Sequence, residues 1–330
     1  RAANPPHLPS AGRGSVIALG WRTSDRPPFR NPEASSRACD KMTSLELPLT
    51  RKDLLPKGRR DRTLFIVMTV MTPAITLFEL LVVLPQYHDS IDALVCLHSV
   101  LAVFIVVNIL GNMYRVIQIG TGVRDSGCQL PAVLLPGWRY CPVCQVNAPP
   151  RSHHCNVCDQ CILKHDHHCM FAGRCVGFFN QRYFVMGLVY IFFGTLYSLI
   201  YQLDYCVASM GGMRLFFLLG QLAPHFGWLL GVFGWRGFFC STLNLFQMLT
   251  VALSGYMLVV QAQGIWTNQT TYERRHGIVR YHAGLRRNLR EALGTSWYLV
   301  WLGPWVRSPA LGDGLRFDNG IEALVEGKRL

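Results

Sequence analysis

Cysteine and histidine gather in one short segment of this chain, where they can bind metal or supply a reactive thiol. The stretch HCNVCDQCILKHDHHCMFAGRC, residues 154–175, holds five cysteines and four histidines. A further Cys-x-x-Cys pair precedes it at Cys141 and Cys144. Disulfides, a zinc site and a nucleophile are the three chemistries open to such a segment. Cys-x-x-Cys pairs in series with interspersed histidines favour zinc, because one tight turn presents both thiolates to one ion.

The number of candidate ligands exceeds what two zinc sites need. Zinc takes four nitrogen or sulfur ligands, so two tetrahedral sites use eight. With His153, His165 and His167 set aside, nine candidates remain: Cys141, Cys144, His154, Cys155, Cys158, Cys161, His168, Cys169 and Cys175. One of the nine is therefore left over, and the spacing alone does not identify it.

The composition of the whole chain indicates a membrane protein. Half of the 330 residues are hydrophobic and only 15% are charged, against about a quarter in soluble domains. The net charge of +13 resides in segments that flank apolar stretches. We therefore interpret the basic charge as facing an anionic lipid surface and expect no nucleic-acid partner.

Four apolar stretches are long enough to cross a bilayer as helices, which takes about 20 residues. They cover residues 63–84, 91–114, 183–203 and 238–260. A fifth apolar stretch, residues 215–235, contains Pro224, His225 and four glycines. We expect it to be re-entrant or interfacial and not a fifth span.

The placement of lysine and arginine predicts the orientation of the spans. Six basic residues lie in the run 51–62, the connector 85–92 has none, and ten follow Gln261. Both termini and the cysteine-rich loop are therefore expected on the cytoplasmic side. A reducing compartment disfavours disulfides, which leaves zinc and a reactive thiol.

These patterns predict an all-α integral membrane protein with a zinc domain between its second and third helices. The expected organisation is a disordered, basic region over residues 1–62, with Met42 as the hypothesised natural start. Helices follow over 63–114, the zinc domain over 115–182, two further helices over 183–260 with a lumenal connector at 204–237, and a cytoplasmic tail over 261–330. In the tail, residues 288–306 are predicted to form an interfacial amphipathic helix.

The segment Asp166-His167-His168-Cys169 resembles the name-giving motif of the DHHC protein S-acyltransferases, membrane enzymes that palmitoylate cysteines. QTTYE at 269–273 is similar to the Thr-Thr-x-Glu motif of that family, Asn288 resembles its C-terminal asparagine, and CVGFFNQRYF at 175–184 matches its entry into the third span. The resemblance covers about residues 63 to 303. GRCVGF at 173–178 and LGDG at 311–314 are similar to a divergent animal subgroup of the family, known as DHHC-containing protein twenty-four.

The resemblance implies two structural zinc ions and a free nucleophile. The first zinc would take Cys141, Cys144, His154 and Cys161, and the second Cys155, Cys158, His168 and Cys175. Cys169 would then be the nucleophile. His167 is the expected general base and Asp166 would orient its imidazole, as in a Cys-His-Asp triad.

The same resemblance implies a substrate, a donor and a location. Palmitoyl-CoA or another long-chain acyl-CoA would acylate Cys169, which would pass the chain to cytoplasmic-side proteins with juxtamembrane cysteines. A cavity among the helices, bordered by Gly187, Gly194, Ser241 and Asn244, would hold the chain. Lys164, Arg182 and Arg274 are the expected contacts for the CoA phosphates. Endomembranes, the endoplasmic reticulum or the Golgi, are the expected location.

The chain also departs from the family pattern, which keeps alternatives open. Met170-Phe171 stands where most members have Pro-Trp after the cysteine, and Arg174 stands where Asn commonly precedes the last zinc ligand. These departures motivate a second hypothesis, a catalytically weak or inactive zinc-loop membrane adaptor. A membrane-anchored RING-like ubiquitin ligase is less consistent with the ligand spacing, because the motif at 166–169 has no role there.

Overall fold

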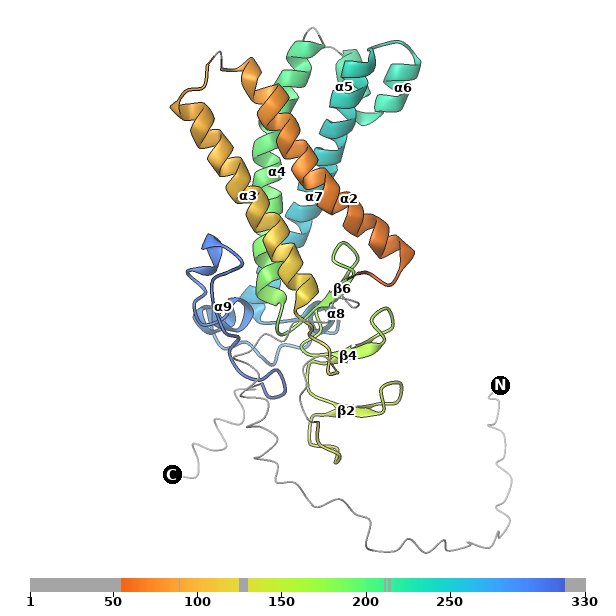
Figure 1. Ribbon diagram of the computed structural model, residues 1–330. Coiled ribbons are helices and arrows are strands. Elements are labelled where there is room, and N and C mark those ends of the chain that lie inside the picture. The colour runs from red at the N-terminus through yellow and green to blue at the C-terminus, as the bar shows by residue number, and fades with distance from the viewer. Residues whose placement is uncertain (1–54, 89, 125–129, 211, 213–214, 318–330) are drawn as a thin grey trace, which may run out of the picture.

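Four long helices form a bundle, and small hairpins and short C-terminal helices gather at one of its ends (Figure 1). The computed structural model describes residues 55–88, 90–124, 130–210, 212 and 215–317. The predictions for residues 1–54, including a start at Met42, lie outside the described residues.

The four predicted spans are confirmed as helices long and apolar enough to cross a membrane. They are α2 (Arg59–Phe78), which continues through a π turn (Glu79–Val83) and a 3-10 turn (Leu84–Gln86), α3 (Ala93–Gln118), α4 (Gln181–Ser209) and α7 (Trp235–Thr267). Asp92 starts α3 because its side chain accepts a hydrogen bond from the Val95 N–H at 2.8 Å. Asn268 ends α7 in the left-handed conformation. Each helix extends a few residues past the apolar stretch that predicted it.

The fifth apolar stretch does not form a span. It breaks into α5 (Leu215–Leu222) and α6 (Pro224–Leu229), because Pro224 lacks the N–H that would continue α5. Gln221 of α5 is buried and donates to the Ser241 hydroxyl of α7 at 2.9 Å. The two short helices therefore pack on the end of α7.

Three antiparallel hairpins built alike connect α3 to α4. Their strands are β1 (Arg139–Cys141) with β2 (Val146–Ala148), β3 (His153–Cys155) with β4 (Gln160–Ile162), and β5 (His167–Cys169) with β6 (Arg174–Val176). The turn of each hairpin ends in a residue with positive φ: Gln145, Asp159 and Gly173. The repeated turn places the side chains of successive hairpins in equivalent positions.

The C-terminal region consists of α8 (Thr271–Arg275), α9 (Leu285–Leu293) and a 3-10 turn (Val300–Leu302). The helix expected over 288–306 is therefore shorter and begins earlier. It ends at Gly294, whose φ is +87° and whose missing side chain leaves room for the Ser308 carbonyl. Ser308 in turn donates to the Leu293 carbonyl at 2.8 Å. Residues after Gly294 fold back along α9 because this contact closes the turn.

Asn180 joins the hairpins to the bundle. Its buried amide donates to the carbonyls of Val116 and Ile119 at the end of α3, and to that of Cys175 in β6. Its oxygen accepts from the Gly177 N–H at 2.9 Å. One side chain thus fixes the end of α3, the last hairpin and the start of α4 relative to one another.

We expect Asn180→Ala to destabilise the whole protein. An orphaned buried polar group costs about 1–3 kcal/mol, and several partners are orphaned here. Thermal unfolding in detergent should show a clearly lower midpoint, whereas Asn156→Ala, the same change at an exposed position of the β3–β4 turn, should leave it unchanged. Equal midpoints for the two variants would contradict this role.

Candidate metal and thiol site

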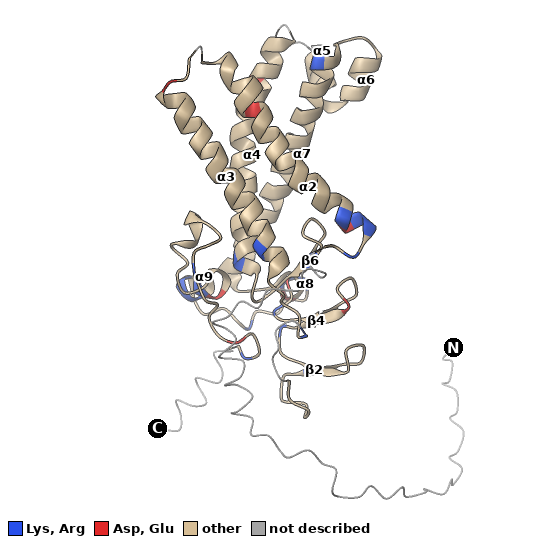
Figure 2. Cartoon of the chain, in the orientation of Figure 1, with Lys and Arg blue, Asp and Glu red and all other residues tan. Residues whose placement is uncertain are grey.

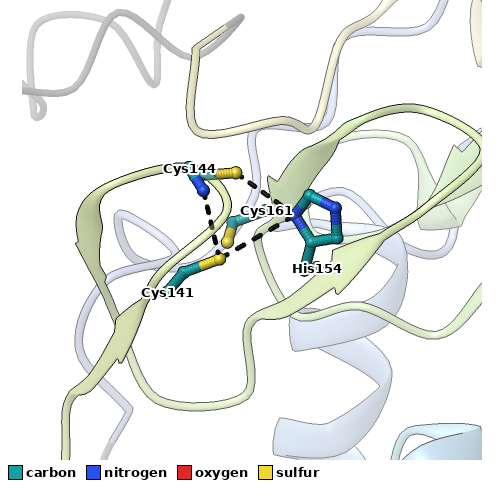
Figure 3. Close-up of side chains that lie close together, drawn as sticks. All are labelled: Cys141, Cys144, His154 and Cys161. Carbon is teal, nitrogen blue, oxygen red and sulfur yellow. Dashed lines mark hydrogen bonds between the residues drawn. The ribbon is translucent and has the colours of Figure 1, made fainter.

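The first metal-binding cluster comprises Cys141, Cys144, His154 and Cys161. Cys141 and Cys144 come from the β1–β2 hairpin, whereas His154 and Cys161 face each other across β3 and β4. The His154 Nδ1 atom lies 3.2 Å from the Cys144 sulfur and 3.8 Å from the Cys141 sulfur (Figure 3). The four ligand atoms therefore converge on one point from two hairpins.

The second cluster repeats this arrangement one hairpin further along the chain. It comprises Cys155, Cys158, His168 and Cys175. The His168 Nδ1 atom lies 3.4–3.7 Å from the three sulfurs, and the Cys158 and Cys175 sulfurs are 3.6 Å apart.

The geometry of both clusters suits zinc. Bonds of about 2.3 Å to sulfur and 2.0–2.1 Å to nitrogen give tetrahedral edges of roughly 3.6–3.8 Å. The distances between the ligand atoms in both clusters, 3.2–3.8 Å, lie close to these edges. The structure thus brings together the members of both predicted ligand sets.

The hairpins also explain why Cys169 is the cysteine left over. In the first two hairpins, the pairs Cys141–Cys144 and Cys155–Cys158 supply two thiolates to a metal that the following hairpin completes. Cys169 stands in the same place in the third hairpin, paired with Arg174, but Ala172 stands where the second cysteine would be. No further hairpin follows, because α4 begins at Gln181. Cys169 thus occupies a ligand position that has no metal site.

Asp166 lies next to this thiol and is held by donors from three elements. Its carboxylate accepts from the Gln261 amide of α7 at 2.8 Å, from the N–H and hydroxyl of Thr271 at 2.8 and 3.1 Å, and from His167 Nδ1 at 2.8 Å. Burial would raise the pKa of Asp166, but these hydrogen bonds outweigh it and hold that pKa well below its usual range. The carboxylate is therefore ionised and fixed against the imidazole.

His167 and Cys169 lie on the same face of β5, because residues two apart in a strand point the same way. Burial would lower the pKa of His167, but Asp166 and the Cys169 thiol raise it to about 9. Burial would likewise raise the pKa of Cys169, but His167 and the backbone N–H groups of Ala172 and Phe171 lower it. The Nε2 atom of His167 is buried and has no hydrogen-bond partner among the described residues. The arrangement thus favours a Cys169 thiolate next to a His167 imidazole that carries the proton.

The Thr-Thr-x-Glu segment at residues 270–273, directly after α7, connects this site to the C-terminal region. Thr270 and Glu273 form a capping box that starts α8. Glu273 also binds the Arg151 guanidinium through two contacts of 2.8 and 2.9 Å, with the Arg151 side chain fully buried. Arg151 and Gln261 were not predicted as site residues, since each is an isolated polar residue without a motif in the sequence.

The three predicted CoA contacts occupy different settings. Lys164 is buried in a left-handed turn, where desolvation lowers its pKa to about 8. Arg182 donates to the Val306 carbonyl at 3.1 Å, and Arg274 donates to the Val260 carbonyl and to the Thr271 hydroxyl. Lys164 and Arg182 are buried and Arg274 is half-buried, and the role of all three toward CoA stays a prediction.

A cavity lies among the four long helices. Gly194 lines it, as predicted, whereas Gly187, Ser241 and Asn244 are not among its lining residues. Phe65, Met113, Phe171 and Phe184 pack in the cluster that contains Cys169. The cavity begins at Met68 of α2 and Ile109 of α3, about one helical turn beyond that cluster. The Phe171 ring thus belongs to the apolar layer around the Cys169 thiol.

The sequence matches the family model described as DHHC palmitoyltransferase over residues 136–277. Among curated proteins, it is 35% identical to "Probable palmitoyltransferase ZDHHC24" of Danio rerio over 58% of this chain and 65% of that protein. It is 33% identical to the Rattus norvegicus protein of that name over 77% of this chain and 90% of the relative. The corresponding Homo sapiens protein is 35% identical, over 68% of this chain and 78% of the relative.

The geometry predicts opposite effects on metal content for two neighbouring cysteines. Cys175→Ser should lose one equivalent of zinc, because it removes a ligand of the second cluster. Cys169→Ser should keep the wild-type zinc content, since its sulfur belongs to neither cluster. Metal analysis of the purified proteins by mass spectrometry checks this, and loss of zinc from Cys169→Ser would show that the ligand set is wrong.

Proposed function

The chain belongs to the DHHC palmitoyltransferase family and is a protein S-acyltransferase, and we propose that it works through an acyl-thioester on Cys169. The observation that carries the proposal is a thiol outside both metal-binding clusters, next to half-buried His167, whose imidazole is hydrogen-bonded to buried Asp166. The acyl donor is a long-chain acyl-CoA, and the acceptor is a cysteine of another protein.

In the first half-reaction, the Cys169 sulfur attacks the thioester carbonyl of acyl-CoA. The bond between that carbonyl and the CoA sulfur breaks, and the departing CoA thiolate takes the proton held on His167 Nε2. Asp166 keeps the imidazole in place through Nδ1 and stabilises its charged form. Acyl-Cys169 and free CoA are the products of this step.

In the second half-reaction, His167 Nε2 takes the proton of a substrate cysteine. The resulting thiolate attacks the carbonyl of acyl-Cys169, and the Cys169 sulfur leaves. Bound zinc supplies charge neutralisation and rigidity to the thiolate-rich loop. No zinc ligand takes part in the transfer, because Cys169 is outside both clusters.

The cavity among the helices is the proposed site for the acyl chain. Each buried methylene contributes about 0.8 kcal/mol, so a long chain gains much of its binding energy there. Lys164, Arg182 and Arg274 remain the proposed contacts for the CoA phosphates, since cationic side chains suit them. Arg274 is the candidate nearest to the thiol along the hydrogen-bond network. It donates to the Thr271 hydroxyl, which in turn donates to Asp166 beside Cys169.

The proposed orientation places the hairpins, the C-terminal region and the N-terminus on the cytoplasmic side of an endomembrane of the endoplasmic reticulum or Golgi. Figure 2 shows that Lys and Arg concentrate at the end of the bundle that carries the hairpins. This asymmetry supports the orientation, because basic loops stay on the cytoplasmic side. Membrane lipid and cytoplasmic-side proteins with juxtamembrane cysteines are the proposed partners.

We expect labelled palmitoyl-CoA to transfer its chain to the purified wild-type protein and not to Cys169→Ala. Neutral hydroxylamine should release the label, because it cleaves thioesters. Cys96→Ala, which removes an exposed thiol of α3, is the matched control and should label like the wild type. Absence of label on zinc-loaded wild-type protein would favour the adaptor hypothesis, which the family relationships do not favour.

Filling the cavity should change the preference for chain length. A methyl group added at Gly194 would meet Ile105 of α3 at 2.5 Å, whereas one at Gly187 meets only Asn112 at 3.4 Å. Gly194→Ala should therefore disfavour the longest acyl chains by roughly tenfold relative to shorter ones, and Gly187→Ala should not. Competition between acyl-CoA donors of different length measures the ratio. An unchanged ratio in Gly194→Ala would argue against this cavity.

A further inference from the structure

The two metal-binding clusters are alike in their ligands but differ in what surrounds their histidines. In each cluster the histidine turns Nδ1 toward the sulfurs, which leaves Nε2 facing outward. The Nε2 atom of His168 lies 2.9 Å from a carboxylate oxygen of Asp61. No such contact is recorded for His154 among the described residues. The carboxylate partner is therefore found at the second cluster, whose histidine, His168, directly precedes Cys169.

Asp61 comes from a distant part of the chain. It stands in the first turn of α2, more than a hundred residues before His168. Asp61 is itself buried, although the residues on either side of it are exposed. In Figure 1 the first turn of α2 lies beside the hairpin labelled β6, away from the other long helices.

A second contact holds the same two parts together. A methyl group added at Gly173, in the turn between β5 and β6, would meet the Pro56 ring at 2.5 Å. Pro56 is buried, and its carbonyl accepts a hydrogen bond from the Arg62 guanidinium at 3.3 Å. The segment before α2 is thus folded back onto the helix while it rests on the tip of the hairpin that carries Cys169.

These contacts matter because α2 has few others inside the protein. Only 6% of the residues in the most apolar 18-residue segment of this helix are buried inside the protein, the smallest share among the four candidate spans. The Asp61–His168 hydrogen bond and the Pro56–Gly173 contact therefore set much of the position of its first turns. Phe65, one turn further along α2, packs in the cluster around Cys169.

We propose that Asp61 is a positioning residue of the second zinc site, whose carboxylate holds His168 and thereby ties the start of α2 to the hairpin that carries Cys169. A carboxylate on the outer N–H of a zinc-bound histidine fixes the ring orientation and the tautomer that binds through Nδ1. Loss of such a partner typically weakens metal binding by about 10–100-fold. The inference concerns metal retention and does not depend on acyl transfer by Cys169.

The test compares metal release at the two sites in the full-length protein loaded with zinc. A chelator and a thiol alkylating reagent are added together, and mass spectrometry of tryptic peptides follows each cysteine. In Asp61→Ala, we expect Cys155 and Cys158 to be alkylated about 10–100-fold faster than in the wild type. The rates at Cys141 and Cys144 should stay unchanged, because none of the described carboxylates contacts His154.

Two further variants separate this role from a general effect of charge or of folding. Asp159→Asn removes a negative charge from an exposed position of the β3–β4 turn, beside the same cluster, and should leave all rates at the wild-type values. Asp61→Asn keeps the size of the side chain and replaces Asp61→Ala in the test if the latter does not fold. We expect this variant to be alkylated roughly tenfold faster than the wild type at Cys155 and Cys158.

Equal rates in the Asp61 variants and the wild type would overturn the proposal. Equal acceleration at both sites would also overturn it, since Asp61 would then act only on overall stability, as an acidic residue at a helix N-terminus does. Because the readout is alkylation at the zinc ligands, this result is independent of whether Cys169 forms a thioester.

Discussion

The carboxylate of Asp166 is the junction on which the arrangement of this protein depends. It receives hydrogen bonds from α7 through Gln261, from the start of α8 through Thr271, and from His167 beside the thiol. A buried charge is tolerated only when it is fully paired, so these elements cannot separate without a large cost. The position of the C-terminal region and the state of the proposed nucleophile are therefore linked through one side chain.

The hairpins explain how a reactive thiol arises from a metal-binding architecture. Each Cys-x-x-Cys turn points sulfur toward a site that the following hairpin completes. In the third hairpin Ala172 replaces the second cysteine and the long helix α4 follows, so the sulfur of Cys169 keeps its position but belongs to neither metal-binding cluster. The turn still directs backbone N–H groups at that sulfur, which favours the thiolate.

The departures from the family pattern have unequal consequences in the structure. Phe171 packs in the apolar cluster around Cys169 and so supplies an aromatic ring next to the thiol. Arg174 lies opposite Cys169 in the hairpin, and its Nε and Nη2 atoms are buried without a hydrogen-bond partner in the part of the chain that the structure describes. The first departure is accommodated by packing, and the second leaves two buried guanidinium N–H groups without a partner among the described residues, close to the proposed active site.

The four long apolar helices, the break in the stretch 215–235 and the presence of enough ligands for two zinc sites could all be predicted from the residues alone. These features depend on local composition and on short spacings, which a sequence shows directly. The division of the ligands into two sets, with Cys169 left over, came from the resemblance to a family. The equal spacing of Cys141, Cys155 and Cys169 was available in the sequence as a sign of three similar hairpins. The packing of distant segments was needed to show that Gln261 and Thr271 hold Asp166, that Arg151 binds Glu273, and that Asp61 contacts His168. These contacts join residues about a hundred positions apart, and no local period or motif encodes which buried polar groups will meet when the helices pack.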